Sequence, residues 1–249
     1  MYNNSTIDIY NEDCLIGMSR IQDKSIDMIL TDLPYGTTDC KWDIIIPFDK
    51  LWEQYNRIIK DNGVILLFGS GVFFAELILS NKENFRYELI WEKERPTNIF
   101  FLKNQFAKVH ENIAVFYKEQ PKYFPVMEDR RFNTIGVFRG EKQSKTHEDQ
   151  TYKYSEDYDK SKVYPRSVLK FNRDTLKGSL HPTQKPVSLL EYLIKTYTEE
   201  GDIVLDSCMG SGSTMIACKS TKRNGIGFEK DKDIFDVANS RIKKFNFLF

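Results

Sequence analysis

Short, continuous apolar runs alternate with amphipathic helical stripes at both ends of this chain. Residues 64–68 (VILLF) and 202–206 (DIVLD) lack the polar alternation of a half-exposed strand, which indicates strands covered on both faces. Residues 48–63 and 187–201 place apolar side chains at helical spacing, and each stretch ends in glycine. Strands and helices that alternate in this way form a parallel sheet with helices on both faces. We therefore predict an α/β fold with a mostly parallel, doubly wound sheet.

The middle of the chain breaks this rhythm. Periodicity fades from about residue 121 to residue 177, where polar and charged residues dominate, as expected of a long loop or a mobile segment. The predicted organisation is a core in two parts, 1–94 and 178–249, with an inserted region at 95–177. The remaining elements are predicted as strands at 25–32, 86–93, 112–119 and 225–229 and as helices at 71–81, 213–222 and 231–245.

Several classes of protein are disfavoured by simple features. No stretch reaches the roughly 18 apolar residues of a membrane span, and the N-terminus lacks the basic and apolar regions of a signal peptide. The four cysteines are scattered without the spacing of a zinc pair, which favours reduced thiols and a cytoplasmic location. The three histidines are equally dispersed, so no metal site is predicted.

Charge is balanced overall but unevenly distributed. Residues 92–177 contain 18 Lys and Arg against 13 Asp and Glu, so this middle region carries an excess of five positive charges on a chain of net charge zero. A basic region favours an anionic partner such as nucleic acid. A solvated, charged insertion is the alternative explanation.

A glycine-rich segment, VLDSCMGSGST, follows the second buried run. It reads as a strand ending at Asp206, a loop with Gly210 and Gly212, and the start of a helix. Glycines allow a ligand to approach the backbone closely, and a helix N-terminus offers free N–H groups. A dinucleotide fingerprint would need Gly or Ala where Met215 stands, and the lysine of a P-loop is absent. A glycine-rich turn without a ligand remains the alternative.

The next predicted strand ends at Glu229. A carboxylate in this place can accept hydrogen bonds from both hydroxyls of a ribose. Glycine loop, helix, strand and acid thus come in the order that a nucleoside site requires.

A third acid, Asp32, ends the predicted strand 25–32 and is followed by Leu-Pro-Tyr-Gly. Pro and Gly at this place are explained equally well by a simple turn.

Together these stretches resemble the amino-group DNA methyltransferases, which use S-adenosylmethionine. DLPY (32–35) resembles their catalytic Asp-Pro-Pro-Tyr motif, and DSCMGSGST resembles their Asp-Pro-Phe-x-Gly-Ser-Gly cofactor loop. HPTQKPVSLLEYLI (181–194) is similar to the segment before that loop, and YNEDCLIGM (10–18) to a Gly-Asp-Cys-Leu segment beside the adenine of the cofactor. The order of the motifs is that of the beta class. It implies a Rossmann-like methyltransferase fold in which the inserted region, 95–177, recognises the target.

The resemblance also implies the cofactor site, which lies across the carboxyl ends of the strands. Gly210 and Gly212 would pass close to the methionine part of S-adenosylmethionine, and Glu229 would bind its ribose. Asp13 would reach its adenine, and Lys185 is a candidate partner for its carboxylate. The full predicted cofactor-binding set is Asp13, Cys14, Asp32, Lys185, Asp206, Gly210, Ser211, Gly212 and Glu229.

The catalytic set implied by the resemblance is Asp32, Leu33, Pro34 and Tyr35. Asp32 and the carbonyl of Leu33 would each accept one N–H of the target amine, which localises the nitrogen lone pair. Pro34 would stiffen the loop. Tyr35 would stack on a base flipped out of double-stranded DNA.

An acid at the head of the tetrapeptide favours adenine N6, because the cytosine-N4 enzymes usually carry Ser there. A cytosine-N4 methyltransferase and a non-catalytic DNA-binding relative are the alternatives. Such enzymes work either alone or in restriction-modification systems. Dimerisation is common in the family, so a homodimer is a candidate assembly.

Three departures from the family pattern stand out. Leu33 replaces the first Pro of the tetrapeptide but keeps the backbone carbonyl that the chemistry needs. Ser207 and Cys208 replace Pro-Phe, and Glu12 stands where the N-terminal segment usually has Gly. Candidate DNA contacts are Arg130, Arg131, Arg139, Arg166, Arg173 and the aromatic segment 97–112.

Overall fold

The computed structural model describes residues 5–38, 40, 43–129, 159, 161–174 and 184–245. The chain divides into two compact units. The larger comprises Met1–Phe124 with Ser167–Phe249, and the smaller comprises Pro125–Arg166. In the smaller unit, β6 (Glu128–Asp129) pairs antiparallel with β7 (Lys162–Val163).

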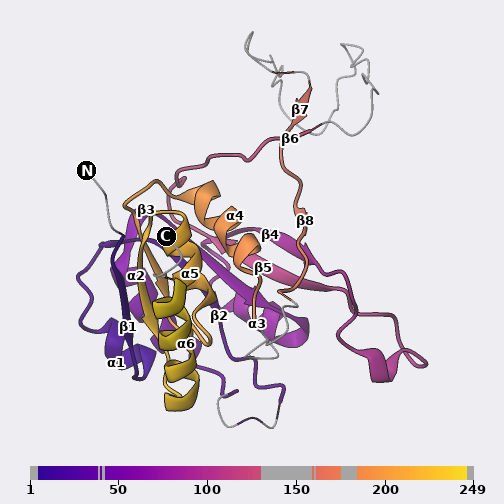
Figure 1. Cartoon of the computed structure of the whole chain (residues 1–249), viewed down its shortest axis with the longest axis horizontal. Helices are drawn as coiled ribbons and strands as arrows, with labels where there is room; N and C mark the ends of the chain where they lie inside the picture. The colour runs from indigo at the N-terminus through magenta and orange to yellow at the C-terminus, as the bar shows by residue number, and fades with distance from the viewer. Residues whose placement is uncertain are drawn as a thin grey trace. The chain divides into compact units, whose positions relative to one another are not determined.

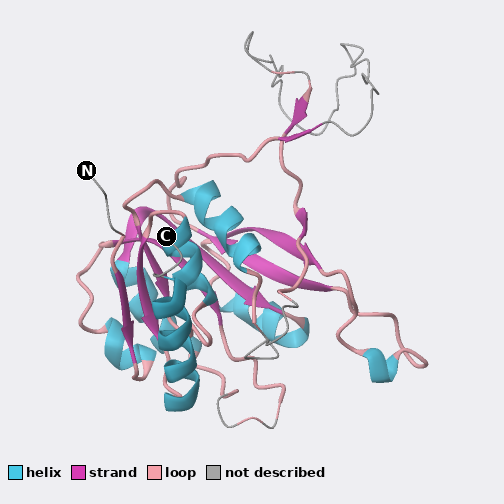
Figure 2. Cartoon of the chain, viewed as in Figure 1, coloured by secondary structure: helices cyan, strands magenta, loops and turns pink. Residues whose placement is uncertain are grey.

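An eight-stranded sheet forms the centre of the larger unit, with the strand order β1-β10-β9-β2-β3-β5-β4-β8 (Figures 1 and 2). The pairs from β1 to β3 are parallel, as is β4 with β8, whereas β5 runs antiparallel to both of its neighbours. The predicted, mostly parallel sheet is therefore confirmed. The strands are β1 (Ile7–Tyr10), β2 (Ile26–Asp32), β3 (Ile59–Gly69), β4 (Phe85–Glu92), β5 (His110–Phe116), β8 (Val168–Lys170), β9 (Ile203–Asp206) and β10 (Asn224–Phe228).

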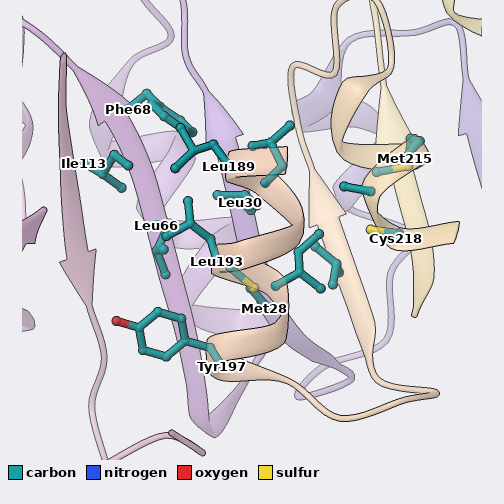
Figure 3. Packing of buried hydrophobic residues seen from close by; sticks show 14 of the residues in the cluster. Met28, Leu30, Leu66, Phe68, Ile113, Leu189, Leu193, Tyr197, Met215 and Cys218 are labelled. Atoms are coloured by element: carbon teal, nitrogen blue, oxygen red, sulfur yellow. The ribbon is translucent and has the colours of Figure 1, made fainter. Parts of the chain in front are cut away.

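Helices cover both faces of this sheet. Side chains of each strand alternate between the two faces, so every central strand contributes to both helix–sheet interfaces. Met28 and Leu30 of β2 belong to one buried cluster with α4, α5 and α6, whereas Ile29 belongs to a second cluster with α1, α2 and α3. In Figure 3, Leu189 and Leu193 of α4 point toward the sheet. The helices are α1 (Cys14–Met18), α2 (Phe48–Ile58), α3 (Gly71–Ser80), α4 (Val187–Tyr197), α5 (Ser213–Ser220), α6 (Lys232–Phe245) and the 3₁₀ turn η1 (Ile99–Phe101).

Two helices end about one full turn earlier than predicted. Instead of continuing to residue 62, α2 stops at Ile58, because Ile59 is extended and already pairs with Ile26 as the start of β3. Instead of continuing to residue 201, α4 stops at Tyr197. Thr198 is extended there, and its backbone and side-chain oxygens accept hydrogen bonds from Arg223. In both places a long-range partner outweighs local helical spacing.

The unit boundaries differ from the predicted limits of the insertion. Strands β5 and β8 fall inside the predicted 95–177 region, yet both pair within the main sheet. The smaller unit begins only at residue 125 and ends at residue 166. The sequence predicts β5 as a strand at 112–119, but it did not reveal that β5 and β8 complete the main sheet. The target-recognition role of the region stays a prediction.

Among the described residues, no helix combines the length and apolar character needed to cross a membrane. Within that same part of the chain, no three His, Cys, Asp or Glu side chains are grouped to hold a metal ion.

Candidate active site

A cavity of about 630 Å³ opens at the carboxyl ends of the parallel strands. Asp32 and Asp206 are the last residues of the neighbouring strands β2 and β9, and Glu229 directly follows β10. Parallel strands direct their carboxyl ends to one edge, so three acids that are far apart in the sequence line one cavity. Other predicted residues that line it are Asp13, Cys14, Leu33, Pro34, Lys185, Gly210 and Ser211.

The two glycines of the loop between β9 and α5 have different roles. Gly210 has a φ of +52°, and a Cβ added there would meet nothing within 4 Å, so its backbone borders open space in the cavity. Gly212 has a φ of +79° at the start of α5, and a Cβ there would lie 3.2 Å from the Cβ of Ala238. Gly212 therefore permits a left-handed turn and close packing against α6, and it is not among the residues that line the cavity.

Arg241 of α6 anchors this loop and was missed by the sequence reasoning. Its Nη1 donates to the backbone oxygen of Ser211 at 2.5 Å and to Ser211 Oγ at 2.8 Å. An arginine in the last helix carries no local sign of this role, because its partner lies 30 residues earlier.

Glu229 closes the loop from the other side. Its Oε2 accepts the N–H of Gly210 at 3.0 Å, and its Oε1 accepts the N–H of Asp231 at 2.8 Å. Burial raises the pKa of Glu229, and these hydrogen bonds counter the rise. Each carboxylate oxygen keeps a further lone pair, so Glu229 can still accept hydrogen bonds from a ligand.

Asp206 is almost completely buried below the loop. Burial raises its pKa to about 7, although hydrogen bonds from the Thr214 hydroxyl and the N–H of Cys208 act in the opposite direction. A positively charged ligand next to this carboxyl group would favour its ionised form.

The N-terminal segment reaches the same cavity because β1 pairs with β10. Asp13 caps α1 by accepting the N–H of Leu15 at 3.0 Å, and its other oxygen pairs with Lys230 Nζ at 3.1 Å. Asn11 Nδ2 donates to the backbone oxygen of Glu229 at 2.9 Å. These contacts hold Asp13 and Cys14 beside the glycine loop, from the opposite end of the chain.

Asp32 is oriented by two donors. The hydroxyl of Tyr35 donates to Asp32 Oδ1 at 2.8 Å, and Lys185 Nζ donates to Asp32 Oδ2. Burial and the nearby carboxylate keep the pKa of Tyr35 well above its usual value, so the phenol stays protonated as a donor. The ring of Tyr35 stacks on Phe73 with centroids 4.8 Å apart, which the sequence reasoning did not anticipate. Its predicted stacking on a flipped base stays a prediction.

Behind Asp32, the buried charges alternate in sign. Lys185 Nζ lies 3.1 Å from Glu111 Oε2, and Glu111 Oε1 pairs with Lys93. Burial tends to raise the pKa of Glu111, but Lys185 and Lys93 outweigh it and hold this pKa at about 2. The pKa of Lys185 is raised despite burial, because Asp32 and Glu111 both stabilise its charge. We call Lys93, Glu111, Lys185 and Asp32 the charge chain.

Sequence reasoning missed half of the charge chain. It placed Lys185 near a cofactor carboxylate, whereas the structure places it between Asp32 and Glu111. Lys93 directly follows β4, and Glu111 belongs to β5. The pairing of these strands sets Trp91 opposite Glu111 at the same edge of the sheet. The only local signal was a charged residue at the end of each of two apolar runs.

The predicted DNA contacts are only partly described. Arg173 pairs with Glu94, with Nε 3.2 Å from Oε1. Within the smaller unit, Arg166 pairs with Glu128 at 3.7 Å. Arg130, Arg131 and Arg139 lie outside the described residues.

The sequence of this chain is similar to that of known DNA methylases. The profile of a DNA methylase family, N6_N4_Mtase, matches residues 26–240. The Type II methyltransferase M2.MboI of Moraxella bovis is 29% identical over 261 residues, covering 94% of this chain and 86% of that protein. The Type II methyltransferase M.HpaI of Haemophilus parainfluenzae is 28% identical over 241 residues, covering 90% and 70%.

Solved structures are similar over almost the whole chain. A complex of M1.HpyAVI with SAM is 25% identical, with a TM-score of 0.61, and covers 95% of this chain and 100% of that one. The cytosine-N4-specific PvuII DNA methyltransferase has a TM-score of 0.70 at 15% identity, covering 98% and 92%. At this low identity, the second likeness shows the fold alone.

Proposed function

Because this chain belongs to the DNA methylase family whose profile spans residues 26–240, we propose that it is a site-specific DNA adenine-N6 methyltransferase. S-adenosylmethionine is the cofactor, and DNA is the substrate class of the family. The choice of adenine rests on one observation: the residue that heads the DLPY motif beside the cavity is an acid, Asp32, held by Tyr35 and Lys185.

The described cavity fits S-adenosylmethionine. Its volume of about 630 Å³ lies within the range usual for small-molecule sites, roughly 300–1,000 Å³. The charged residues that line it are six carboxylates and two lysines, which suits a ligand with a sulfonium and an ammonium group. Gly210 offers its backbone without a Cβ in the way. Glu229, Asp13 and Asp206 are the proposed contacts for the ribose, the adenine and the methionine part.

Bound S-adenosylmethionine supplies an electrophilic methyl group. This chain activates the acceptor. The lone pair of an adenine amino nitrogen is delocalised into the ring, and Asp32 localises it by accepting one N–H. The backbone carbonyl of Leu33 accepts the other. Both acceptors bind more strongly as the nitrogen becomes tetrahedral and positive, so they stabilise the transition state.

Both oxygens of Asp32 already accept a hydrogen bond before any target base is present. Lys185 has a second carboxylate, Glu111, within 3.1 Å. It can therefore turn from Asp32 toward Glu111 while its buried charge stays paired. Asp32 Oδ2 then no longer shares its negative charge with an ammonium group and becomes a stronger acceptor for the target amine. Lys93 holds Glu111 in place for this exchange.

Glu111→Gln tests this exchange. Without the second carboxylate, Lys185 should remain on Asp32 and compete with the target amine. We expect this competition to cost the free-energy equivalent of about one pKa unit, so kcat should fall roughly tenfold. The affinity for S-adenosylmethionine should change little. Turnover under saturating cofactor and isothermal titration of the cofactor measure the two quantities.

The double variant Lys93→Met with Glu111→Gln is the matched control, because it also removes the lysine left buried without a partner. Its thermal stability should recover toward that of the wild type, but its kcat should stay low. A double variant with wild-type kcat would mean that Glu111 serves only to neutralise Lys93.

Cytosine N4 is the second candidate, because the matching family profile, N6_N4_Mtase, covers both N6 and N4 methylases. The experiment is to incubate the protein with unmethylated genomic DNA and methyl-labelled S-adenosylmethionine, digest the DNA, and identify the labelled nucleoside. We expect N6-methyldeoxyadenosine. Labelled N4-methyldeoxycytidine would overturn the choice of base. Absence of label with intact cofactor binding would support a non-catalytic DNA-binding relative.

Target recognition is proposed for the inserted region, with the smaller unit, Pro125–Arg166, as its core. The homodimer stays a prediction, and analytical ultracentrifugation of the purified chain would test it.

A further inference from the structure

The loop between β4 and β5 leaves the sheet at the edge that carries Asp32. The strand register shows that the loop and Asp32 share this edge. Asp32 lies opposite Phe68 of β3, and the next residue, Gly69, lies opposite Asn112 of β5. One residue further, Glu111 pairs with Trp91 of β4. Figure 1 shows the loop, with η1 at its tip, projecting away from the sheet. We call residues 95–109 the aromatic loop.

The aromatic loop exposes large apolar side chains. Phe100 and Phe106 are each 97% exposed, and Ile99 and Phe101 are more than half exposed. Single exposed apolar residues are common on protein surfaces. Two almost completely exposed phenylalanines in one loop are not, and such a cluster marks an interaction site.

Hydrogen bonds within the loop fix its conformation. Asn98 Nδ2 donates to the backbone oxygen of Phe106 at 2.9 Å, and Asn98 Oδ1 accepts the N–H of Lys108 at 2.7 Å. The backbone N–H of Thr97 donates to the oxygen of Lys108 at 3.0 Å. These bonds close the neck of the loop, so the two phenylalanines are held out on a formed loop.

The root of the loop touches the charge chain. The N–H of Lys93 donates to the backbone oxygen of Val109 at 2.6 Å, and the side chain of Lys93 pairs with Glu111. Glu111 in turn contacts Lys185, which holds Asp32. The position of the loop is thereby tied to that of the proposed catalytic carboxylate.

The charge of the loop indicates which class of partner it binds. Residues 95–109 contain Arg95, Lys103 and Lys108 and no Asp or Glu. The acid just before the loop, Glu94, is paired with Arg173. Three cations interleaved with exposed aromatic rings fit a polyanion with flat bases, because the cations meet phosphates and the rings stack. A second copy of this loop would bring like charges together.

We infer that the aromatic loop binds double-stranded DNA beside the target and inserts Phe100 or Phe106 into the base stack. The inserted ring replaces stacking that is lost when the target base leaves the helix, much as apolar side chains insert between base steps in architectural DNA-binding proteins. The inference rests on the proposed function, in which a flipped-out base reaches Asp32.

The test compares two duplexes that contain the methylation site mapped in wild-type reactions. One is fully paired, and in the other the target base lies opposite an abasic site, where less stacking and pairing is lost on flipping. The variant Phe100→Ala with Phe106→Ala should lose roughly 5- to 150-fold in kcat/KM on the paired duplex, which is the effect of losing one base–aromatic stacking contact. On the abasic duplex it should stay within about twofold of the wild type.

Two further variants sharpen the result. Phe100→Trp with Phe106→Trp keeps stacking surfaces and should retain activity on the paired duplex. Val72→Ala with Leu79→Ala removes exposed apolar side chains from α3, where they are 74% and 70% exposed, and should behave as the wild type. Equal melting temperatures would show that all variants are folded.

Equal losses on both duplexes would mean that the loop contributes affinity alone and would overturn insertion. Unchanged activity on both would remove the loop from the DNA interface. A wild-type dimer that dissociates in the alanine variant would assign the loop to a second copy of the chain. A wild type inactive on every duplex would instead overturn the proposed function, and insertion with it.

Discussion

Replacing Asp32 with alanine is expected to lower methyl transfer by roughly 10²- to 10³-fold or more, the usual loss when one preorganised transition-state contact is removed. The variant keeps the Leu33 carbonyl, so one acceptor for the amine remains. Affinity for S-adenosylmethionine should change only a few-fold, because the carboxylate acts on the acceptor base. Single-turnover methylation of DNA and calorimetric titration of the cofactor measure the two effects separately.

Two comparisons make the Asp32 result specific. Lys185 keeps Glu111 as a partner in the alanine variant, so its charge is not left unpaired. Asp8→Ala removes an exposed carboxylate from β1 and should leave turnover unchanged. Near-normal turnover of the Asp32 variant would show that the target amine is activated elsewhere.

Replacing Glu229 with alanine is expected to weaken binding of S-adenosylmethionine by roughly 10- to 150-fold, because a hydrogen bond to a charged group contributes about 1.5–3 kcal/mol. The effect has two sources. The variant loses the acceptor for the ribose hydroxyls, and it leaves the N–H groups of Gly210 and Asp231 without their carboxylate. Saturating cofactor should restore much of kcat, since Glu229 does not touch the acceptor base.

Glu12 provides the control for this second prediction. It also lines the cavity, but it pairs with Arg20, and we assign it no ligand contact. Glu12→Ala should change the cofactor Kd by less than about threefold, the scale of an exposed ion pair. Equal losses for Glu12 and Glu229 would indicate a general response to cavity charge and would contradict a ribose contact at Glu229.

The local features of this protein were readable from its sequence. Continuous apolar runs revealed β2, β3 and β9 because a strand covered on both faces needs no polar alternation. Asp32, Asp206 and Glu229 end predicted strands, and the family resemblance implied a cofactor site across the carboxyl ends of those strands. Family motifs then added Asp13 and Lys185, and the structure places all five at one cavity.

Tertiary structure decided what these residues contact. Lys185 meets Asp32 and Glu111 because β5 lies antiparallel between β3 and β4, a strand order that no local pattern encodes. Gly212 packs on α6 and Arg241 holds Ser211 for the same reason: each partner is distant in the chain. Periodicity and turn chemistry act over a few residues and determine elements, whereas the neighbours of a buried charge depend on strand order and register.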